Sequence, residues 1–325
     1  MSLHFVHLDV FTNRLFGGNQ LAVYLDPPHG LPTATMQAIA REMAFSETTF
    51  VFPPPEPDPA TAGVSVDWRV RIFTPASELP MAGHPTIGTA FALADAGRVA
   101  PGTPRVVFAE GVGPVPVDLE WADGRLAFAW MTQPRPVFGP VVREVEAFAV
   151  ATNLAVADIG PNGWPMQQVS CGVPFVIIPV ASRAALDRAM PDARAHAHAF
   201  AAAGLPEGHV YLFTLEPGPD GADVYTRMFA PDIGITEDAA TGSAAGPLGA
   251  YLVHHGLVAA GDRPIRNLQG VKMGRPSWIH IVPVFDEVGT DPTGGTDPAG
   301  GTVPVAMRVG GEAVIAGAGS LALEE

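Results

Sequence analysis

Apolar and polar residues alternate along several short stretches of the chain. Residues 4–11 alternate in this way, and the apolar runs at 21–25 and 66–73 are bounded by turn residues. Alternation and short apolar runs between Gly or Pro are typical of β-strands. We expect further strands at 45–52, 167–178 and 209–215, within 104–132, and from 264 onward. The pattern therefore predicts a protein rich in β-sheet.

A second spacing predicts helices between these strands. Residues 33–44 place apolar side chains at Met36, Ile39, Ala40 and Met43, the spacing of one helix face. Further helices are expected at 141–157, 184–190 and 193–204, and after Gly83 and Gly242.

Residues 71–97 and 227–256 carry the same pattern. RIFTP opens the first stretch and RMFAP the second, and an acidic residue precedes Gly83 or Gly242 by five positions. From each of these glycines a helix is expected to run fourteen residues to a closing glycine, Gly97 or Gly256. The chain therefore contains one unit twice, and a ligand pocket between two halves is expected.

The order of elements repeats at a separation of roughly 155–160 residues, so the 325-residue chain is expected to form two α/β domains. The predicted halves are 1–131, with the final strand near 310–325 as a candidate to complete it, and 132–309. Residues 286–302 are rich in Gly, Thr, Pro and Asp, which predicts a flexible insert without a catalytic role.

Composition excludes several classes of protein. Apolar residues make up 47% of the chain and charged residues 16%, which favours a folded globular protein. The net charge of −15 disfavours nucleic acid as a partner. No uninterrupted apolar run is long enough for a membrane span, and no secretion signal is evident at the N-terminus. The single cysteine, Cys171, is consistent with a cytoplasmic protein.

Four side chains are candidates for proton chemistry. Glu47 lies in an apolar strand region, where partial burial tends to raise a carboxyl pKa; the alternative is a structural Glu paired with a neighbour. Asp238 and His84 lie beside the two helix starts, where they could equally stabilise a helix dipole or form a structural hydrogen bond. Ser243 could be an N-cap residue alone, and no G-x-S-x-G motif surrounds it.

The two helix starts are themselves candidate anion sites. Gly83 and the stretch Thr241-Gly242-Ser243 would expose backbone N–H groups of the kind that hold carboxylates and phosphates. The sequence contains no P-loop, no G-x-G-x-x-G after a strand and no HExxH, and its His pairs are poorly spaced for a metal. We therefore expect no metal and no cofactor.

Several motifs together resemble the phenazine-biosynthesis PhzF-like isomerase family. These are FVHLDVFTNRLFGGNQLAVYLD, SETTFVF, RIFTPASELPMAGHPTIGTA and RMFAPDIGITEDAATGSAAGPLGAYL, in family order across nearly the whole chain. The resemblance implies a diaminopimelate-epimerase-like fold with two pseudo-symmetric halves, each a curved mixed sheet around a central helix. It also implies a site between the halves and often a homodimer.

The resemblance also implies roles for the candidate residues. In the best-understood type of member, trans-2,3-dihydro-3-hydroxyanthranilate is isomerised without a cofactor, and a Glu removes the proton from C3. That role falls on Glu47, and His84, Asp238 and Ser243 match the orienting and proton-exchanging residues. Gly83, Gly242 and nearby N–H groups, including those at Thr241, would hold the substrate carboxylate.

Related epimerases use two cysteines, whose positions are held here by Ala82 and Ala239, while Cys171 lies elsewhere. The sequence thus favours an isomerase of a small cyclic carboxylated metabolite that works by a general acid–base proton shift. Two alternatives remain at this point: an epimerase that acts through Glu47 and Asp238 without thiols, and a non-catalytic binding protein.

Overall fold

The computed structural model describes residues 2–54, 64–206, 208–258, 263–285 and 303–323. The predicted flexible insert, 286–302, lies outside the described residues. The chain divides into two compact units, each described by itself below. Unit 1 comprises Met1–Thr132 with Gly310–Glu325, and unit 2 comprises Gln133–Val309. The last strand of the chain therefore belongs to the first unit.

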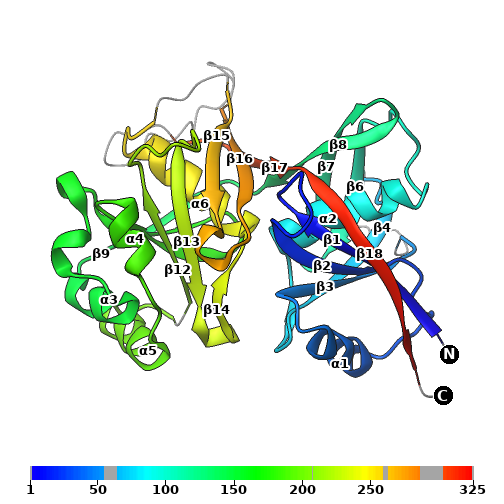
Figure 1. Cartoon of the computed structure of the whole chain (residues 1–325), viewed down its shortest axis with the longest axis horizontal. Helices are drawn as coiled ribbons and strands as arrows, with labels where there is room; N and C mark the ends of the chain where they lie inside the picture. The colour runs from blue at the N-terminus through cyan, green and yellow to red at the C-terminus, as the bar shows by residue number, and fades with distance from the viewer. Residues whose placement is uncertain (1, 55–63, 207, 259–262, 286–302, 324–325) are drawn as a thin grey trace. The chain divides into compact units, whose positions relative to one another are not determined.

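Unit 1 is a mixed sheet with two helices (Figure 1). Its elements are β1 (Ser2–Val10), β2 (Asn19–Tyr24), α1 (Thr33–Met43), β3 (Glu47–Phe52), β4 (Trp68–Phe73), β5 (Glu78–Leu79), α2 (Gly83–Asp95), β6 (Arg105–Glu110), β7 (Gly113–Ala122), β8 (Arg125–Gln133) and β18 (Ala313–Ala322).

Unit 2 is built from the same kinds of element with more helices on its outside. Its elements are β9 (Val137–Val142), α3 (Val145–Thr152), β10 (Met166–Ser170), β11 (Pro174–Pro179), α4 (Arg183–Arg188), α5 (Ala193–Ala202), β12 (His209–Thr214), β13 (Val224–Ala230), β14 (Ile235–Asp238), α6 (Gly242–His254), β15 (Ile265–Gln269), β16 (Ser277–Val284) and β17 (Ala306–Gly311).

The two sheets have the same order of strand pairings. In unit 1, β1–β2 is antiparallel, β2–β3 parallel, β3–β4 and β4–β5 antiparallel, β4–β6 parallel and β6–β7 antiparallel. In unit 2, β10–β11 is antiparallel, β11–β12 parallel, β12–β13 and β13–β14 antiparallel, β13–β15 parallel and β15–β16 antiparallel. The internal repetition predicted from the sequence is therefore present in the topology.

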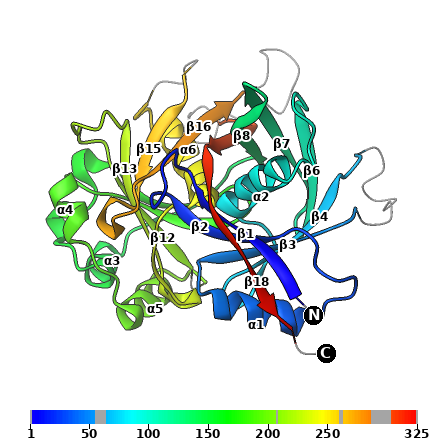
Figure 2. The same ribbon diagram turned by 45° about the vertical axis from the view of Figure 1, so that its right-hand side comes forward.

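Each unit encloses one helix within its sheet. Figures 1 and 2 show α2 surrounded by the strands of unit 1, and every residue from Gly83 to Leu93 is buried. In unit 2, α6 is buried in the same way along nearly its whole length. A helix that is apolar on all sides must be covered on all sides, which explains why Ala, Gly and Leu dominate both sequences.

Both central helices begin at the predicted glycines and end two residues before the predicted closing glycines. α2 begins at Gly83 and α6 at Gly242. Gly97 and Gly256 follow the helices with φ values of +67° and +65°, in the left-handed region that glycine adopts most easily. Each stop is closed by a backbone hydrogen bond from the next residue, for example from Arg98 N to Leu93 O at 2.8 Å.

An Arg–Glu pair recurs at the same place in both units. Arg71 Nε donates to Glu78 Oε1 at 2.7 Å, and Arg227 Nε donates to Glu237 Oε1 at 2.8 Å. The second arm of each guanidinium donates to the other carboxylate oxygen at 2.6 Å. Each two-armed pair ties the strand that precedes the central helix to the short strand beside it.

The outer faces of the sheets are covered by the remaining helices. In unit 1, α1 packs its apolar side on Tyr24, Phe50 and Phe73. In unit 2, α3, α4 and α5 cover a larger cluster that includes Phe148 and Phe200. Each sheet is therefore buried on both faces, by its central helix and by its outer helices.

The predicted elements were wrong in three places. The helix expected at 141–157 is divided, because Val141 and Val142 end β9 and only Val145–Thr152 is helical. The short strands β5 and β14 were not predicted, since both lie in segments rich in acid and Gly or Pro. The strand expected at 66–73 begins only at Trp68.

Among the helices that the structure describes, none combines the length and apolar character needed to cross a membrane.

Candidate functional site

Glu47 is the first residue of β3 and is buried. Its neighbour in the parallel pairing with β2 is Leu21, and only 7% of its surface is exposed. The strand continues with apolar and Thr residues that are also buried, so the polar residue at its start is carried into the core edge of unit 1. A buried carboxylate needs polar neighbours, which the following contacts supply.

His84 faces Glu47 from the first turn of α2. Its Nε2 lies 3.4 Å from Glu47 Oε2, and the ring is 2% exposed. Asn19, at the start of β2, donates from Nδ2 to His84 Nδ1 at 3.2 Å. Ser46 Oγ donates in turn to Asn19 Oδ1 at 2.9 Å. Three elements of unit 1 therefore hold the imidazole against the carboxylate.

The His84 ring is neutral around pH 7. Burial lowers the pKa of His84 to about 3, because a charged imidazolium would lose its hydration. Nδ1 lies 3.2 Å from Asn19 Nδ2, and the second ring nitrogen is Nε2. This nitrogen is the one that faces Glu47.

The start of α2 lacks a capping side chain. The N-cap residue is Ala82, which has no polar group, and Gly83 and His84 follow it directly. The first N–H groups of a helix have no partner within the helix, so this end favours an anion. The predicted carboxylate-binding glycine, Gly83, is thus beside the Glu47–His84 contact.

In unit 2, Asp238 and Thr241 are joined directly. Thr241 Oγ1 donates to Asp238 Oδ2 at 2.6 Å, and both residues are 5% exposed. Asp238 ends β14, and Thr241 is the N-cap residue of α6 but makes no side-chain cap. The Thr241 hydroxyl is therefore committed to Asp238.

Gly242 and Ser243 form the first turn of α6. Gly242 is buried and Ser243 is half-buried. Because the N-cap position is held by Thr241, the alternative interpretation of Ser243 as an N-cap residue was wrong. Gly242 O also accepts from Gln133 Nε2 at 2.8 Å, which holds this turn within unit 2.

Cysteine and metal chemistry have no site among the described residues. Cys171 is buried between β10 and β11, and burial raises the pKa of its thiol to about 12. A thiol with such a pKa is a poor base near neutral pH. No group of three or more His, Cys, Asp and Glu side chains suited to a metal occurs in the part of the chain that the structure describes.

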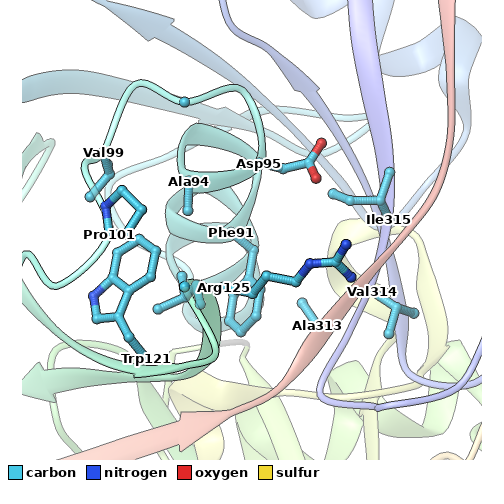
Figure 3. A pocket seen from close by; sticks show the side chains of 13 residues that line it. Phe91, Ala94, Asp95, Val99, Pro101, Trp121, Arg125, Ala313, Val314 and Ile315 are labelled. Atoms are coloured by element: carbon cyan, nitrogen blue, oxygen red, sulfur yellow. The ribbon is translucent and has the colours of Figure 1, made fainter.

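Unit 1 also contains a cavity of about 550 Å³ at the C-terminal end of α2, away from His84 (Figure 3). Phe91 and Trp121 contribute apolar surface, and Arg125 extends across the cavity toward the start of β18. Neither Glu47 nor His84 lines it. This cavity is therefore separate from the candidate catalytic residues of unit 1.

Sequence reasoning missed several supporting residues. Asn19, Gln269, Glu110 and Thr86 were not singled out. Each is a polar residue at the end of an apolar strand or in the first turn of a buried helix. A polar residue at such a boundary was the available signal.

Comparison with known proteins identifies the class of protein. The family model described as phenazine biosynthesis-like protein matches residues 8–293. A relative from Pseudomonas chlororaphis, named trans-2,3-dihydro-3-hydroxyanthranilate isomerase, is 37% identical over 274 residues, covering 84% of this chain and 88% of the relative. An uncharacterized isomerase of Mesorhizobium japonicum is also 37% identical, with 84% and 88% covered.

Solved structures agree with this match. A Bacillus anthracis protein of the PhzF family has a TM-score of 0.80 at 24% identity, with 99% of this chain and 100% of that chain covered. A Pseudomonas aeruginosa protein described as a predicted epimerase has a TM-score of 0.75 at 32% identity, with the same coverage. A probable proline racemase of Agrobacterium radiobacter has a TM-score of 0.67 at 14% identity, with 99% and 93% covered.

The likeness to the proline racemase, and a similar one to a hydroxyproline epimerase, confirms the predicted diaminopimelate-epimerase-like fold. A buried carboxylate beside an imidazole in this fold, together with relatives named isomerases, defines an isomerase. The chain belongs to the PhzF family.

Proposed function

We propose that the chain is a cofactor-independent isomerase of a small cyclic carboxylated metabolite, and that it acts by general acid–base proton transfer. The proposed substrate type is trans-2,3-dihydro-3-hydroxyanthranilate. Relatives that are 37% identical to this chain are named as isomerases of that compound. The observation that carries the proposal is the buried contact between Glu47 and the neutral His84 ring at 3.4 Å.

The proposed reaction needs only proton movements. Glu47 takes the proton from C3, the C–H electron pair enters the ring π-system, and a proton is returned to another ring carbon. Atoms and charge balance without an oxidant. Positioned carboxylates typically accelerate such transfers by about 10²- to 10⁴-fold. His84 Nε2 lies 3.4 Å from Glu47 Oε2, and this contact is proposed to orient the carboxylate for the abstraction.

The remaining predicted residues have supporting roles. The N–H groups at the start of α2 (Gly83) and those at the start of α6 (Gly242 and Ser243) are each proposed as carboxylate-binding groups. Asp238 is proposed as a second proton-exchanging group, and its Oδ2 accepts from Thr241. A homodimer, a cytoplasmic location and the absence of nucleic-acid and membrane partners stay predictions.

Proton NMR of trans-2,3-dihydro-3-hydroxyanthranilate in deuterated buffer tests the proposal. The wild-type protein should isomerise it with deuterium uptake, and Glu47→Gln should lower the rate by about 10²- to 10⁴-fold. Glu42→Gln is the matched control, because Glu42 is an exposed acid on α1 of the same unit. Its rate should equal that of the wild type.

Other outcomes lead elsewhere. If the wild-type protein gives no turnover but the compound raises the melting temperature, a binding site is retained and this substrate is rejected. If deuterium enters with inversion at one carbon and no shift of the double bonds, the thiol-independent epimerase replaces the isomerase.

A further inference from the structure

Two buried polar side chains, Glu110 in unit 1 and Gln269 in unit 2, occupy equivalent places in the two repeats. The strand pairings establish this equivalence. Trp68 pairs with Phe108, and Val224 pairs with Asn267, both in parallel strands. Trp68 and Val224 each lie three residues before the arginine of the recurring Arg–Glu pair, so they are equivalent. Their partners Phe108 and Asn267 are therefore equivalent too.

Glu110 and Gln269 follow two residues later and end their strands. Each is followed by a glycine against which the chain packs closely. A Cβ on Gly111 would lie 2.7 Å from a backbone atom of the residue three positions before α2. A Cβ on Gly270 would lie 2.5 Å from a backbone atom of the residue three positions before α6. Both strand ends are thus pressed onto the segment that leads into the central helix.

Gln269 uses its complete hydrogen-bonding capacity on the entrance to α6. Its Nε2 donates to Asp238 O and to Thr241 Oγ1, both at 2.9 Å. Its Oε1 accepts from Thr241 N at 3.2 Å and from Tyr211 Oη at 2.8 Å. A primary amide has two N–H donors and two acceptor sites, so none is left over.

The direction of these bonds is fixed by the donor groups. Asn267 Nδ2 donates to Tyr211 Oη at 2.7 Å, and Tyr211 then donates to Gln269. Because Thr241 Oγ1 accepts from Gln269, its single proton is free to be donated to Asp238 Oδ2. Every bond in this chain points toward the Asp238 carboxylate, and Tyr211, Asn267 and Gln269 are completely buried.

Glu110 plays the corresponding part at α2. Thr86 Oγ1 lies 2.7 Å from Ala82 O and 2.7 Å from Glu110 Oε1. A hydroxyl has one proton, and a carbonyl can only accept, so Thr86 bonds to both groups at once when Glu110 is protonated and donates to it. Burial raises the pKa of Glu110 to about 8, which agrees with a carboxylic acid at neutral pH. A protonated Glu has the shape of a Gln.

We infer that Gln269 and Glu110 are positioning residues of the two helix entrances. Gln269 holds Asp238 and the Thr241 N–H at α6, and neutral Glu110 holds, through Thr86, the first turn of α2 that carries His84. The consequence for catalysis rests on the proposed function. The positioning itself does not.

Kinetics of Gln269 variants give the first test. Gln269→Leu removes all four bonds, and Gln269→Met removes them while keeping a side chain of similar length. Each should lower kcat by about 10- to 100-fold, with KM changed by less than about threefold, since an orienting residue acts on the reacting geometry. Tyr225→Phe is the control, because it removes one hydrogen bond, to Asp187, elsewhere in unit 2.

Two variants of Glu110 test whether it is equivalent to Gln269 as a neutral donor. Glu110→Gln keeps a donor to Thr86 and should rescue kcat to within about twofold of the wild type, whereas Glu110→Leu should lose about tenfold. Equal losses in both variants would overturn the inference that Glu110 acts as a neutral donor. Wild-type kcat in Gln269→Leu, or an equal loss in Tyr225→Phe, would overturn the role of Gln269.

Amide hydrogen exchange separates this inference from the proposed function. The Thr241 N–H should exchange faster in Gln269→Leu than in the wild type, and Tyr225→Phe should leave it unchanged. Unchanged protection in Gln269→Leu overturns the positioning even if the enzyme is active. Faster exchange in an enzyme that does not act on the proposed substrate supports the positioning and rejects only the substrate. If Gln269→Leu does not fold, Tyr211→Phe, one bond further away, takes its place in both measurements.

Discussion

The two units share one scaffold and differ in where each carries its acid. Glu47 begins β3, and the pairing registers make His209, at the start of β12, its equivalent in unit 2. Asp238 pairs with Met228, and the equivalent residue, paired with Ile72, is Leu79. Each unit thus has one acid at a position where the other unit has none.

This difference teaches which features the repeated fold requires. The strand order, the Arg–Glu pair and the glycine at each helix start occur in both units, so they serve the scaffold. Glu47 and Asp238 occur in one unit each, so the scaffold does not need them. A buried acid without a structural counterpart is a candidate for function.

Removing the acid of unit 2 is expected to give the largest effect. Asp238→Asn should lower turnover by about 10²- to 10⁴-fold, because the amide cannot exchange protons as the carboxyl does. Leu79→Met, at the equivalent position of unit 1, should leave turnover within about twofold. Steady-state kinetics on both variants make the comparison, and similar losses in the two would refute a role specific to Asp238.

A smaller effect concerns stability and pH in unit 1. The pKa of Glu110 is raised by burial from 4.5 to about 8, so the folded state holds a proton that the unfolded state releases between these values. The free energy of unfolding should therefore fall as pH rises from about 4.5 to 8, by on the order of 3–5 kcal/mol in total. Glu110→Gln should remove this contribution.

Denaturant unfolding of the wild type and Glu110→Gln across pH 5–9 measures that contribution as the difference between the two curves. The variant should gain on the wild type as pH rises, since Gln has no proton to lose. Parallel curves would mean that Glu110 is ionised in the folded protein near neutral pH. Its counterpart Gln269 cannot titrate, so this pH effect belongs to unit 1 alone.

The smallest expected difference between the units is in how much each Arg–Glu pair contributes to the free energy of unfolding. The side chains of Arg227 and Glu237 are 7% and 14% exposed, and Arg227 also donates to Leu186 O and Ala189 O. Arg227→Met should cost about 3 kcal/mol of unfolding free energy, because it leaves a buried carboxylate and two carbonyls without their donor. The more exposed pair of unit 1 should lose about 1 kcal/mol or less with Arg71→Met.

Chemical denaturation of the two methionine variants compares them under one condition. The loss in Arg71→Met should shrink further at high salt, while that in Arg227→Met should persist. Equal losses would show that burial does not distinguish the two pairs.

Much of this fold could be predicted from the sequence because the same pattern of residues occurs in both halves of the chain. The matched RIFTP and RMFAP stretches located both central helices at Gly83 and Gly242. The division between β9 and α3 was missed because Val141 and Val142 fit a helical apolar pattern as well as a strand, and only pairing with β10 decides between them. Local sequence contains no information about that partner.

The candidate site was predicted in its acids and glycines but not in its supporting residues. Glu47 and His84, predicted separately, lie 3.4 Å apart in unit 1. Gln269 and Glu110 were missed because their importance comes from contacts with residues 24–31 positions away, which no spacing rule connects. Single polar residues at strand ends are common, and only the fold shows which of them meet a helix start.

The pairing of β18 with β1, from Ser2 opposite Ala322 to Val10 opposite Ala313, has a consequence for synthesis on the ribosome. All segments of unit 2 are translated before β18. We expect unit 2, which is continuous in the chain, to fold first, because domains fold as they emerge. Until β18 is available, the edge of β1 that pairs with it is unpaired, and unpaired strand edges promote aggregation. The nascent chain should thus be most dependent on chaperones in the interval before its last strand arrives.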